Sequence, residues 1–264
     1  MNEKIKIKAG ATVANVSCGF DCLGYSISEP YDILTIKKLD EPGINITVEG
    51  PGKDEIPLLA DKNTAGKAIQ SLITKLDITN GFSVKILKGI RPGSGIGSSA
   101  ASAAAAVKGV NHILGNPLSL KELIVHAMAG EVASAGVSHA DNVAPSLLGG
   151  MTLVRSYDPL DILKIPVPDN LWSSVIQVKY IVKTKDARAI LPKNVSLKSA
   201  VAQAGNLTGF TIGLINSDFD LISRSMEDLF AEPYRQKLIP GYNLVKKAAI
   251  ECGAIGCGIS GSGP

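Results

Sequence analysis

The chain has 264 residues, of which 45% are hydrophobic, 19% charged and 5% aromatic, and its formal net charge is +3. This length and composition fit one large or two packed globular domains. The basic residues are scattered and the aromatic residues are few. A nucleic-acid surface is therefore not expected. No run of about 18 apolar residues occurs, so no membrane span is expected either.

The start of the chain, MNEKIKIKAG, alternates between charged and apolar residues and predicts a strand, not a signal peptide. We therefore expect a cytoplasmic protein. The four cysteines form a C-x3-C pair and a distant C-x4-C pair, at residues 18, 22, 252 and 257. These spacings match zinc knuckles poorly, so free thiols are expected, with a zinc site as the alternative.

The first half of the chain predicts strands and helices in mixed order. Alternating patterns and helical spacing predict three strands, a helix, a strand and an alanine-rich helix, over residues 4–8, 31–39, 44–49, 63–77, 82–90 and 98 to about 114. Ser119 and Glu122 form a capping box that begins a further helix over 120–136. A polar loop over 138–142, a short helix ending at Gly149 and Gly150, and a strand from Met151 follow.

The Pro-rich stretch 158–170 is the expected junction between two domains, residues 1–157 and 158–264. The second half predicts a strand, three helices and a last strand, over 175–183, 197–216, 218–229, 240–252 and 254–260. Strands and helices alternate without a regular β-α-β rhythm. The fold class is therefore α+β, with helices covering one face of largely antiparallel sheets.

The stretch RPGSGIGSSAASAAAAVKGV places Gly93, Gly95 and Gly97 between a predicted strand and the alanine-rich helix. A phosphate chain needs backbone N–H groups at close range, and glycine leaves that approach open. The following helix adds the positive end of its dipole, and Ser98 and Ser99 add hydroxyls. The spacing is neither a Walker A loop nor a G-x-G-x-x-G fingerprint. A plain glycine-rich turn is the alternative.

Five segments together resemble one known family. PGSGIGSSAAS resembles the central motif of the GHMP kinases, the family of galactokinase, homoserine kinase and mevalonate kinase. ATVANVSCGFDCLGYSI, GVSHADNVAPSLLGG, KTKDARAILP and GCGISGSGP are similar to further blocks, which occur in the order seen in homoserine kinases. The resemblance spans the whole chain, and three of the blocks favour the homoserine kinases over the wider family.

The resemblance implies two α+β domains, the first like ribosomal protein S5 domain 2 and the second ferredoxin-like. It also implies a reaction, in which ATP and L-homoserine give ADP and O-phospho-L-homoserine on the route to threonine. Gly10 and the pair Ser17-Cys18 depart from the first block, which puts the shape of that loop in doubt. Homoserine kinases usually continue beyond the position of Pro264, so the second domain is expected to be truncated.

Homoserine carries an ammonium, a carboxylate and a hydroxyl, and the resemblance assigns a residue to each charge. Asp21 is expected to bind the ammonium, with Asn15 in the same loop as a second polar contact. Arg188 offers a planar fork to the carboxylate. Arg235 is a candidate second fork, with a solvated surface arginine as an equal alternative. His139 is expected to contact the substrate.

The resemblance assigns ATP binding to the glycine-rich segment and two residues before it: Asn63, Lys88, Pro92, Gly93, Ser94, Gly95, Ile96, Gly97, Ser98, Ser99, Ala100, Ala101 and Ser102. Glu131 lies at helical spacing from Leu120 and Ile124 and is expected to face the core. A buried carboxylate needs a partner. A magnesium ion shared with Ser99 would supply it, and an ion pair with Lys or Arg is the alternative.

In phosphoryl transfer, the protein contributes mainly by positioning the reacting groups and neutralising charge. Asp141 occupies the position of a catalytic base in relatives, and Asn142 is expected to orient groups nearby. Direct proton transfer to a phosphate oxygen is the alternative to a base. A turn formed by Gly258, Ser260, Gly261 and Gly263 is expected to face the active site.

Two other functions remain open from the sequence. A GHMP kinase acting on mevalonate or a sugar is the nearest rival, but those substrates offer Asp21 no ammonium. A catalytically inactive relative that only binds a ligand is the second. No nucleic-acid or membrane partner is expected, and a homodimer is the candidate oligomer.

Overall fold

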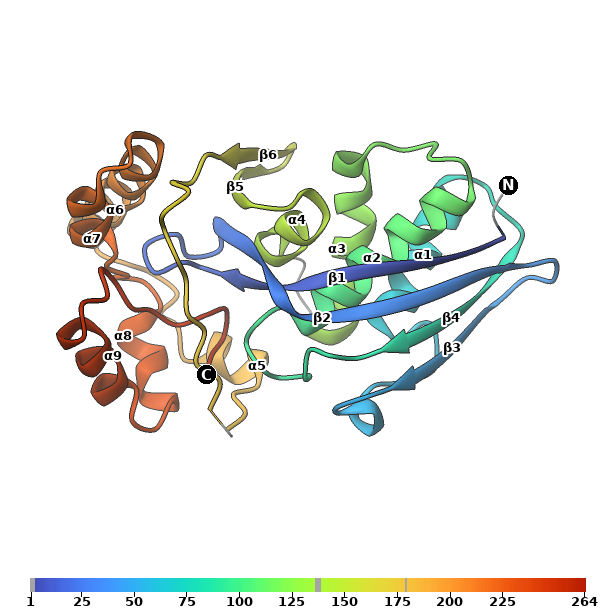
Figure 1. Cartoon of the computed structure of the whole chain (residues 1–264), viewed down its shortest axis with the longest axis horizontal. Coiled ribbons are helices and arrows are strands. Elements are labelled where there is room, and N and C mark those ends of the chain that lie inside the picture. The colour runs from blue at the N-terminus through green and yellow to red at the C-terminus, as the bar shows by residue number, and fades with distance from the viewer. Residues whose placement is uncertain (1–2, 136–138, 179) are drawn as a thin grey trace. The chain divides into compact units, whose positions relative to one another are not determined.

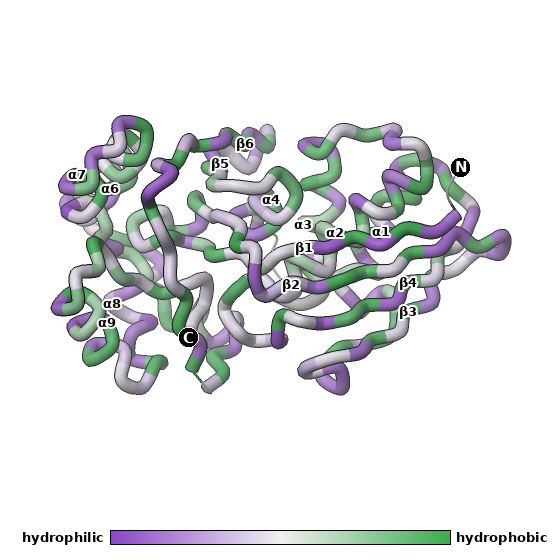
Figure 2. Tube along the Cα trace, viewed as in Figure 1, coloured by the Kyte–Doolittle hydropathy of each residue, from purple (hydrophilic) through white to green (hydrophobic). Residues whose placement is uncertain are grey.

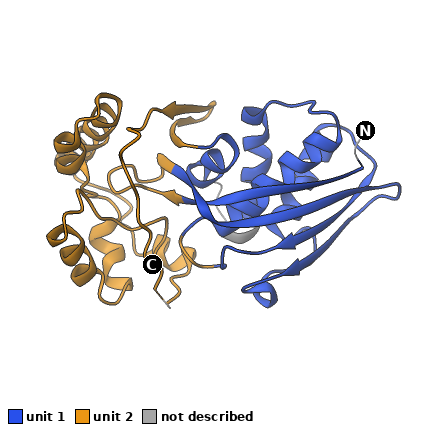
Figure 3. Ribbon diagram, in the orientation of Figure 1, with its two compact units in different colours: residues 1–12, 25–92, 96–149 blue, residues 13–24, 93–95, 150–264 orange. Residues whose placement is uncertain are grey.

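The computed structural model describes residues 3–135, 139–178 and 180–264. The chain divides into two compact units (Figure 3), and neither is one continuous stretch. The first unit contains residues 1–12, 25–92 and 96–149, and the second contains 13–24, 93–95 and 150–264. The glycine-rich segment therefore contributes residues to both units. The domain boundary expected after residue 157 stays a prediction.

Four of the described strands, which lie mostly in the first unit, pair within one sheet: β1 (Lys4–Ala14), β2 (Leu23–Leu39), β3 (Ile44–Glu49) and β4 (Gly81–Leu87). β1 pairs with β2, and β2 runs antiparallel to β4 with Ile36 opposite Val84. β3 runs parallel to β4, with Ile46 opposite the same Val84. The sheets were expected to be largely antiparallel, and this parallel pair is a departure from that pattern. The reason is that a helix connects β3 to β4, and such a crossover brings two strands into parallel order.

Helices α1 (Thr64–Lys75), α2 (Ser98–Ile113) and α3 (Leu120–Ala135) lie together on one side of this sheet (Figure 1). The alternation that predicted β1 is visible along its trace (Figure 2). A Cβ placed on Gly109 of α2 would lie 2.5 Å from Ile36 and 3.1 Å from Ile7. The apolar side of β1 and β2 therefore packs directly under α2.

Alanine allows α2 to lie among its neighbours with almost no exposed side. The run from Ala100 to Val107 is buried, and α2 contacts both α1 and α3. A helix that is apolar all round is expected only inside a core, and small side chains let adjacent helices approach it closely. The predicted alanine-rich helix is confirmed, and it is the centre of the first unit.

The capping box at the start of α3 is confirmed. The Glu122 carboxylate accepts hydrogen bonds from the Ser119 amide at 2.8 Å and the Ser119 hydroxyl at 2.7 Å. The polar loop expected over 138–142 is wrong in its described part, because α4 (Ala140–Leu148) already begins at Ala140; Ser138 lies outside the described residues. Asp141 and Asn142 occupy the first turn of α4, where an acidic side chain is favoured by the helix dipole.

In the second unit, β5 (Met151–Tyr157) and β6 (Leu160–Ile165) form an antiparallel hairpin. The hairpin joins the first residues of β2, and the Val154 amide donates to the Cys22 carbonyl at 2.8 Å. β6 lies within the Pro-rich stretch that was expected to be a linker. The helices of this unit are α5 (Thr184–Ala189), α6 (Leu197–Asn216), α7 (Phe219–Ser225), α8 (Glu232–Arg235) and α9 (Tyr242–Glu251).

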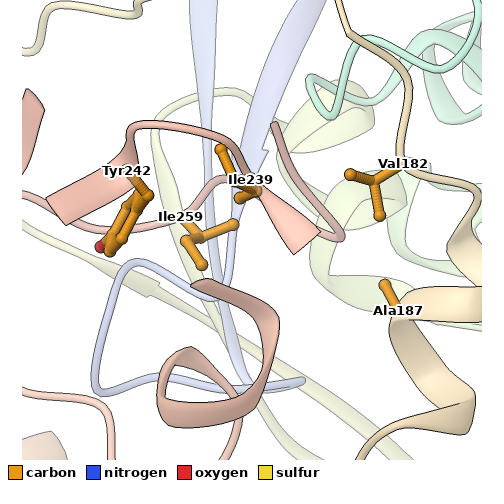
Figure 4. Packing of buried hydrophobic residues seen from close by; sticks show 5 residues of the cluster. All are labelled: Val182, Ala187, Ile239, Tyr242 and Ile259. Atoms are coloured by element: carbon orange, nitrogen blue, oxygen red, sulfur yellow. The ribbon is translucent and has the colours of Figure 1, made fainter. Parts of the chain in front are cut away.

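The strands predicted over 175–183 and 254–260 are wrong for the residues that the structure describes there, which form neither helix nor strand. Alternation of apolar residues suits any extended backbone, whereas a strand also needs a hydrogen-bonded neighbour. The two segments instead supply Val182 and Ile259 to a small core with Ala187, Ile239 and Tyr242 (Figure 4). Of the described helices, none is both long and apolar enough to cross a membrane.

Gly130 offers a test of the packing in the first unit. A Cβ at Gly130 of α3 would lie 2.4 Å from the Thr64 carbonyl oxygen of α1, a backbone atom that cannot turn away. Gly130→Ala should therefore lower the free energy of unfolding by about 1–3 kcal/mol, although alanine is the better helix former. Thermal or denaturant unfolding would measure this.

The matched control is Gly205→Ala, in the exposed part of α6, where a Cβ meets no atom within 4 Å. This change should raise the free energy of unfolding by about 0.5–1 kcal/mol. Equal effects of the two substitutions would contradict the close approach of α3 to α1.

Candidate functional site

The glycine-rich segment adopts a backbone that only glycine takes easily. Gly93, Gly95 and Gly97 have φ values of 70°, 71° and 68°. Gly97 is also the N-cap residue of α2, and a Cβ there would lie 1.9 Å from the Thr12 hydroxyl oxygen. Both the positive φ and the contact exclude side chains at this point. The expectation that this segment needs bare backbone is confirmed.

The first turn of α2 begins directly after this backbone. The first hydrogen bond of the helix runs from the Ala101 amide to the Gly97 carbonyl at 2.9 Å. The amides of the three preceding residues therefore lie ahead of the helical ladder, at the positive end of the dipole. Ser94 is 6% exposed, and among the described residues its hydroxyl has no hydrogen-bond partner. The free helix start favours an anion, and a buried hydroxyl without a protein partner independently fits a polar ligand at Ser94.

Ser99 and Glu131 form a pair behind the first turn of α2. The Ser99 hydroxyl donates to Glu131 Oε2 at 3.0 Å, and Glu131 Oε1 is shielded from solvent although the residue as a whole is partly exposed. Burial raises the pKa of the Glu131 carboxyl to about 7, the Ser99 hydrogen bond acts against this, and the nearby charge of Asp141 raises the pKa further. Glu131 therefore faces inward as predicted, but Leu120, on the same predicted face, is 39% exposed.

Asp141 and Asn142 lie in the first turn of α4, in the same unit as Glu131. Asp141 is buried, and its Oδ1 accepts a hydrogen bond from the Asn142 amide at 3.0 Å. The Thr12 hydroxyl donates to Asn142 Oδ1 at 2.7 Å, and the Thr12 amide donates to the Ile96 carbonyl at 3.1 Å. Thr12 therefore connects the Asn142 side chain to the glycine-rich segment.

The two candidate nucleotide residues outside the glycine-rich segment are both bonded within the protein. Asn63 is the N-cap residue of α1, and its Oδ1 accepts hydrogen bonds from the amides of Ala65 and Gly66 at 2.9 and 3.2 Å. Lys88 is buried and forms an ion pair with Asp32. Burial lowers the pKa of the Lys88 ammonium, and the Asp32 charge acts in the opposite direction. Their roles toward ATP stay predictions.

In the second unit, the loop between β1 and β2 has an unusual backbone. Asn15, Val16, Ser17 and Asp21 all have positive φ values, of 71°, 45°, 58° and 56°. A positive φ is rare outside glycine and especially rare for a β-branched residue such as valine. Such strain persists only where surrounding contacts hold it, and it concentrates at functional sites.

Asp21 and Arg188 meet in this unit. Arg188 Nη1 donates to Asp21 Oδ2 at 2.7 Å, with both side chains about one third exposed. The guanidinium groups of Arg188 and Arg235 lie 5.5 and 5.2 Å from the centre of the Phe20 ring, within the range of cation–π attraction. Two arginines and one aspartate are thus gathered around one aromatic ring.

Arg235 is buried, so the alternative of a solvated surface arginine is wrong. Its guanidinium donates to the carbonyls of Gly261 and Ala187 at 2.8 and 3.2 Å. The Gly261 carbonyl also accepts from Asn15 Nδ2 at 2.7 Å. The Ser260 hydroxyl donates to the Gly95 carbonyl at 2.7 Å. The predicted turn near the C-terminal end of the chain therefore contacts both the strained loop and the glycine-rich segment.

Sequence reasoning missed three residues of these groups. Thr12 stands in a strand and Phe20 beside a glycine, and neither position shows a pattern that indicates a contact. Asp32 is fully buried, and its charge within an alternating strand was the one available signal. His139 directly precedes α4 as its N-cap residue, two positions before Asp141 in the chain. Among the described residues, no group of three or more His, Cys, Asp or Glu is placed to hold a metal.

Comparison with known proteins places this arrangement in a family. Residues 63–150 match the family model of the GHMP kinases N terminal domain, and residues 211–264 match that of the GHMP kinases C terminal domain. The chain belongs to the GHMP kinase family. The two-domain kinase fold expected from the sequence is therefore confirmed.

Several similar proteins are homoserine kinases. Homoserine kinase of Chlorobium phaeobacteroides (strain DSM 266) is 44% identical over 97% of this chain and 83% of its own length. That of Methanococcus vannielii is 43% identical over 99% of this chain and 86% of its own. The crystal structure of homoserine kinase from Cytophaga hutchinsonii is 49% identical, with a TM-score of 0.96, over 100% of this chain and 84% of that one. Within the family, the chain groups with the homoserine kinases.

Glu131 makes the stability of the protein depend on pH. Because the folded pKa of about 7 lies above the ordinary 4.5, the folded chain holds this proton more tightly than the unfolded chain does. The resulting stabilisation is complete below the unfolded pKa and is lost as the pH rises through the folded one. The free energy of unfolding of the unaltered chain should therefore fall, relative to Glu131→Gln, from about pH 5 to about pH 8.

Chemical denaturation at a series of pH values measures this difference. Glu122→Gln, on the same helix, is the control, because hydrogen bonds from Ser119 lower the pKa of Glu122 and move its titration below this range. Parallel curves for the unaltered chain and Glu131→Gln would contradict the raised pKa.

Proposed function

We propose that the protein is a homoserine kinase, which transfers the terminal phosphoryl group of ATP to the side-chain hydroxyl of L-homoserine and releases O-phospho-L-homoserine and ADP. The family supplies the reaction class, and the relatives named above are homoserine kinases. The observation that carries the choice of substrate is the pair formed by Asp21 and Arg188. A cytoplasmic location and a homodimer stay predictions.

A zwitterionic amino acid matches this pair in charge. The ammonium of homoserine can bind the Asp21 carboxylate, and its carboxylate can bind the Arg188 guanidinium, so the substrate replaces one ion pair by two. Mevalonate and sugars have no ammonium, and binding either would leave Asp21 without a new partner. The backbone strain at Asn15 and Asp21 supports a ligand-binding role for this loop.

Arg235 has a different task in this proposal. Its Nη1 and Nε groups already donate to two backbone carbonyls, which fixes the guanidinium near the Phe20 ring. It can add positive charge to the carboxylate subsite and hold the Gly261 turn against Asn15. We therefore assign direct substrate recognition to Asp21 and Arg188, with Asn15 and Arg235 shaping their surroundings.

The glycine-rich segment and α2 supply the features that a triphosphate requires. The unbonded first-turn amides, the positive end of the helix dipole and the buried Ser94 hydroxyl all favour negative charge. ATP is the expected phosphoryl donor of a kinase of this family. In phosphoryl transfer such positioning and charge neutralisation provide most of the catalysis.

Magnesium fits the residues beside this segment. Ser99 and Glu131 would hold the ion, because a hydroxyl and a carboxylate are the ligands that Mg²⁺ takes from a protein when phosphates supply the others. When bound, the ion neutralises charge on the phosphates. The buried Glu131 carboxyl, whose pKa is raised when no cation is near, would ionise readily beside one. Two protein ligands suffice for this arrangement, so the lack of a three-residue cluster in the described part of the chain does not argue against it.

Asp141 is our candidate for accepting the proton of the homoserine hydroxyl, and Asn142 for orienting it. Asp141 is buried next to Glu131, so its carboxylate lies in a region of concentrated negative charge. Thr12 fixes the Asn142 amide by its hydrogen bond to Oδ1, which leaves Nδ2 as the donor group. Direct transfer of the proton to a phosphate oxygen remains the alternative.

A coupled assay of ADP release tests the proposed substrate. The unaltered chain should release ADP with L-homoserine and not with mevalonate under identical conditions. Arg188→Ala should lower kcat/KM for homoserine, because it removes a charge-assisted contact. The decrease should correspond to a loss of at least about 2 kcal/mol of transition-state stabilisation.

Arg155→Ala is the matched control, since Arg155 forms an exposed ion pair with Asp161 in the same unit. It should leave kcat/KM unchanged. Turnover of mevalonate in preference to homoserine, or nucleotide binding without any ADP release, would reject the proposal.

Removal of magnesium tests the assignment of Ser99. Calorimetry should show that a non-hydrolysable ATP analogue binds more tightly with Mg²⁺ than with a chelator. Ser99→Ala should reduce the ratio of these two affinities by about threefold or more. Ser71→Ala, which removes a hydroxyl bonded to His126 elsewhere in the same unit, should leave the difference unchanged. If Ser99→Ala behaves as Ser71→Ala does, Ser99 is not a magnesium ligand.

A further inference from the structure

A buried ion pair lies under the start of α2. The side chains of Asp32, on β2, and Lys88, just after β4, are 0% and 2% exposed. The Lys88 ammonium donates to Asp32 Oδ2, to the Ser98 carbonyl at 3.0 Å and to the Ser102 hydroxyl at 3.0 Å. An ammonium has three N–H donors, so these partners occupy all of them. Lys88 therefore has no donor left for a nucleotide in this arrangement.

The second oxygen of Asp32 holds the segment that leads into the glycine-rich backbone. Asp32 Oδ1 accepts from the amides of Gly89 and Ile90, both at 3.0 Å. The Ser98 hydroxyl donates to the Ile90 carbonyl at 2.9 Å. The pair is thus bonded both to the residues just before the glycine-rich segment and to the first turn of α2, which follows it.

Stability alone explains this pair poorly. Taking two charges out of water costs several kcal/mol for each, and apolar residues of similar size often replace a buried pair at no loss. Asp32 Oδ1 nevertheless holds the amides of Gly89 and Ile90 at one end of a short segment, and one proton of Lys88 holds the Ser98 carbonyl at the other end. Such a fully satisfied network fixes one geometry of that segment, which is what a phosphate-binding backbone needs.

We propose that Asp32 and Lys88 are positioning residues that hold the backbone of residues 90–98 in its phosphate-binding form, and that Lys88 does not contact the nucleotide base. This inference rests on the proposed function, because it presumes that the glycine-rich segment binds the phosphates of ATP. A positioning role thus replaces the direct contact with ATP that the resemblance assigned to Lys88.

Selectivity between nucleotides separates the two roles of Lys88. The test is the charge-balanced double variant Asp32→Asn with Lys88→Met, which leaves no single buried charge. Calorimetry measures its affinity for a non-hydrolysable ATP analogue with Mg²⁺, and competition measures its affinity for adenosine, which has a base and no phosphate. The affinity for the ATP analogue should fall at least about tenfold while that for adenosine stays unchanged, because only phosphates use the positioned amides.

Lys85→Met is the matched control. Lys85 lies on β4 three residues before Lys88, but its ion pair with Glu49 is exposed, so neither affinity should change. A general loss of folded protein would lower the apparent affinity for both ligands equally and is monitored by unfolding. If the double variant does not fold, Ser102→Ala removes one partner of both charged groups, and it should show the same selective loss at about threefold or more.

Two results would overturn the inference. Equal loss for adenosine and the ATP analogue in folded protein would place Lys88 at the base, and no loss for either would make the pair irrelevant to the segment. Failure of the proposed function is distinguishable, because the unaltered chain would then bind no ATP analogue or release no ADP with homoserine.

Discussion

The absence of a side chain at Gly97 is the constraint on which the start of α2 depends. The backbone there has a positive φ, and the Thr12 hydroxyl lies where a Cβ would be. Thr12 can therefore reach Asn142 and also bond the backbone at Ile96. A larger residue at Gly97 would move Thr12 and the first turn of the helix together. One missing methyl group thus determines the geometry of a strand end, a helix start and a polar side chain.

Buried carboxylates around this helix are managed in different ways. Asp32 is neutralised by Lys88 and bonded to two amides, so its charge is retained at a fixed place. Glu131 accepts a hydrogen bond from the neutral Ser99 hydroxyl, and burial together with the nearby charge of Asp141 raises the pKa of its carboxyl. The arrangement at Asp32 holds the backbone of the neighbouring residues in place. The arrangement at Glu131 leaves negative charge that a cation can stabilise, which is the electrostatic property a metal–phosphate site requires.

In the second unit, charged side chains of both signs lie around one aromatic ring. Phe20 has two guanidinium groups near its ring, and Asp21 follows it directly in the chain. The Gly261 carbonyl accepts hydrogen bonds from both Asn15 and Arg235, which ties the strained loop to α8. Residues more than 200 positions apart in sequence therefore define one loop conformation. None of these contacts is local, so none could be read from a sequence pattern.

The sequence by itself determined the elements whose cause is local. The three positive-φ glycines, the capping box of Ser119 and Glu122, and the alanine helix all follow from side-chain size or from hydrogen bonds between near neighbours. It also predicted that Glu131 faces inward, from helical spacing. The chemistry of ATP and homoserine came from resemblance, because no single block of residues specifies a substrate.

Only the tertiary structure decided which extended segments became strands and which charges met. Apolar and polar residues alternate over 175–183 as they do along β4. However, β4 is hydrogen-bonded to a strand on each side, whereas the described part of 175–183 is not paired with any strand. Likewise the partners of Lys88 and Arg235 are distant in sequence, and their burial depends on packing. A periodic pattern indicates which side chains of a segment can be buried together on one face. Hydrogen-bonded partners are supplied by other parts of the chain, and these exist only once it has folded.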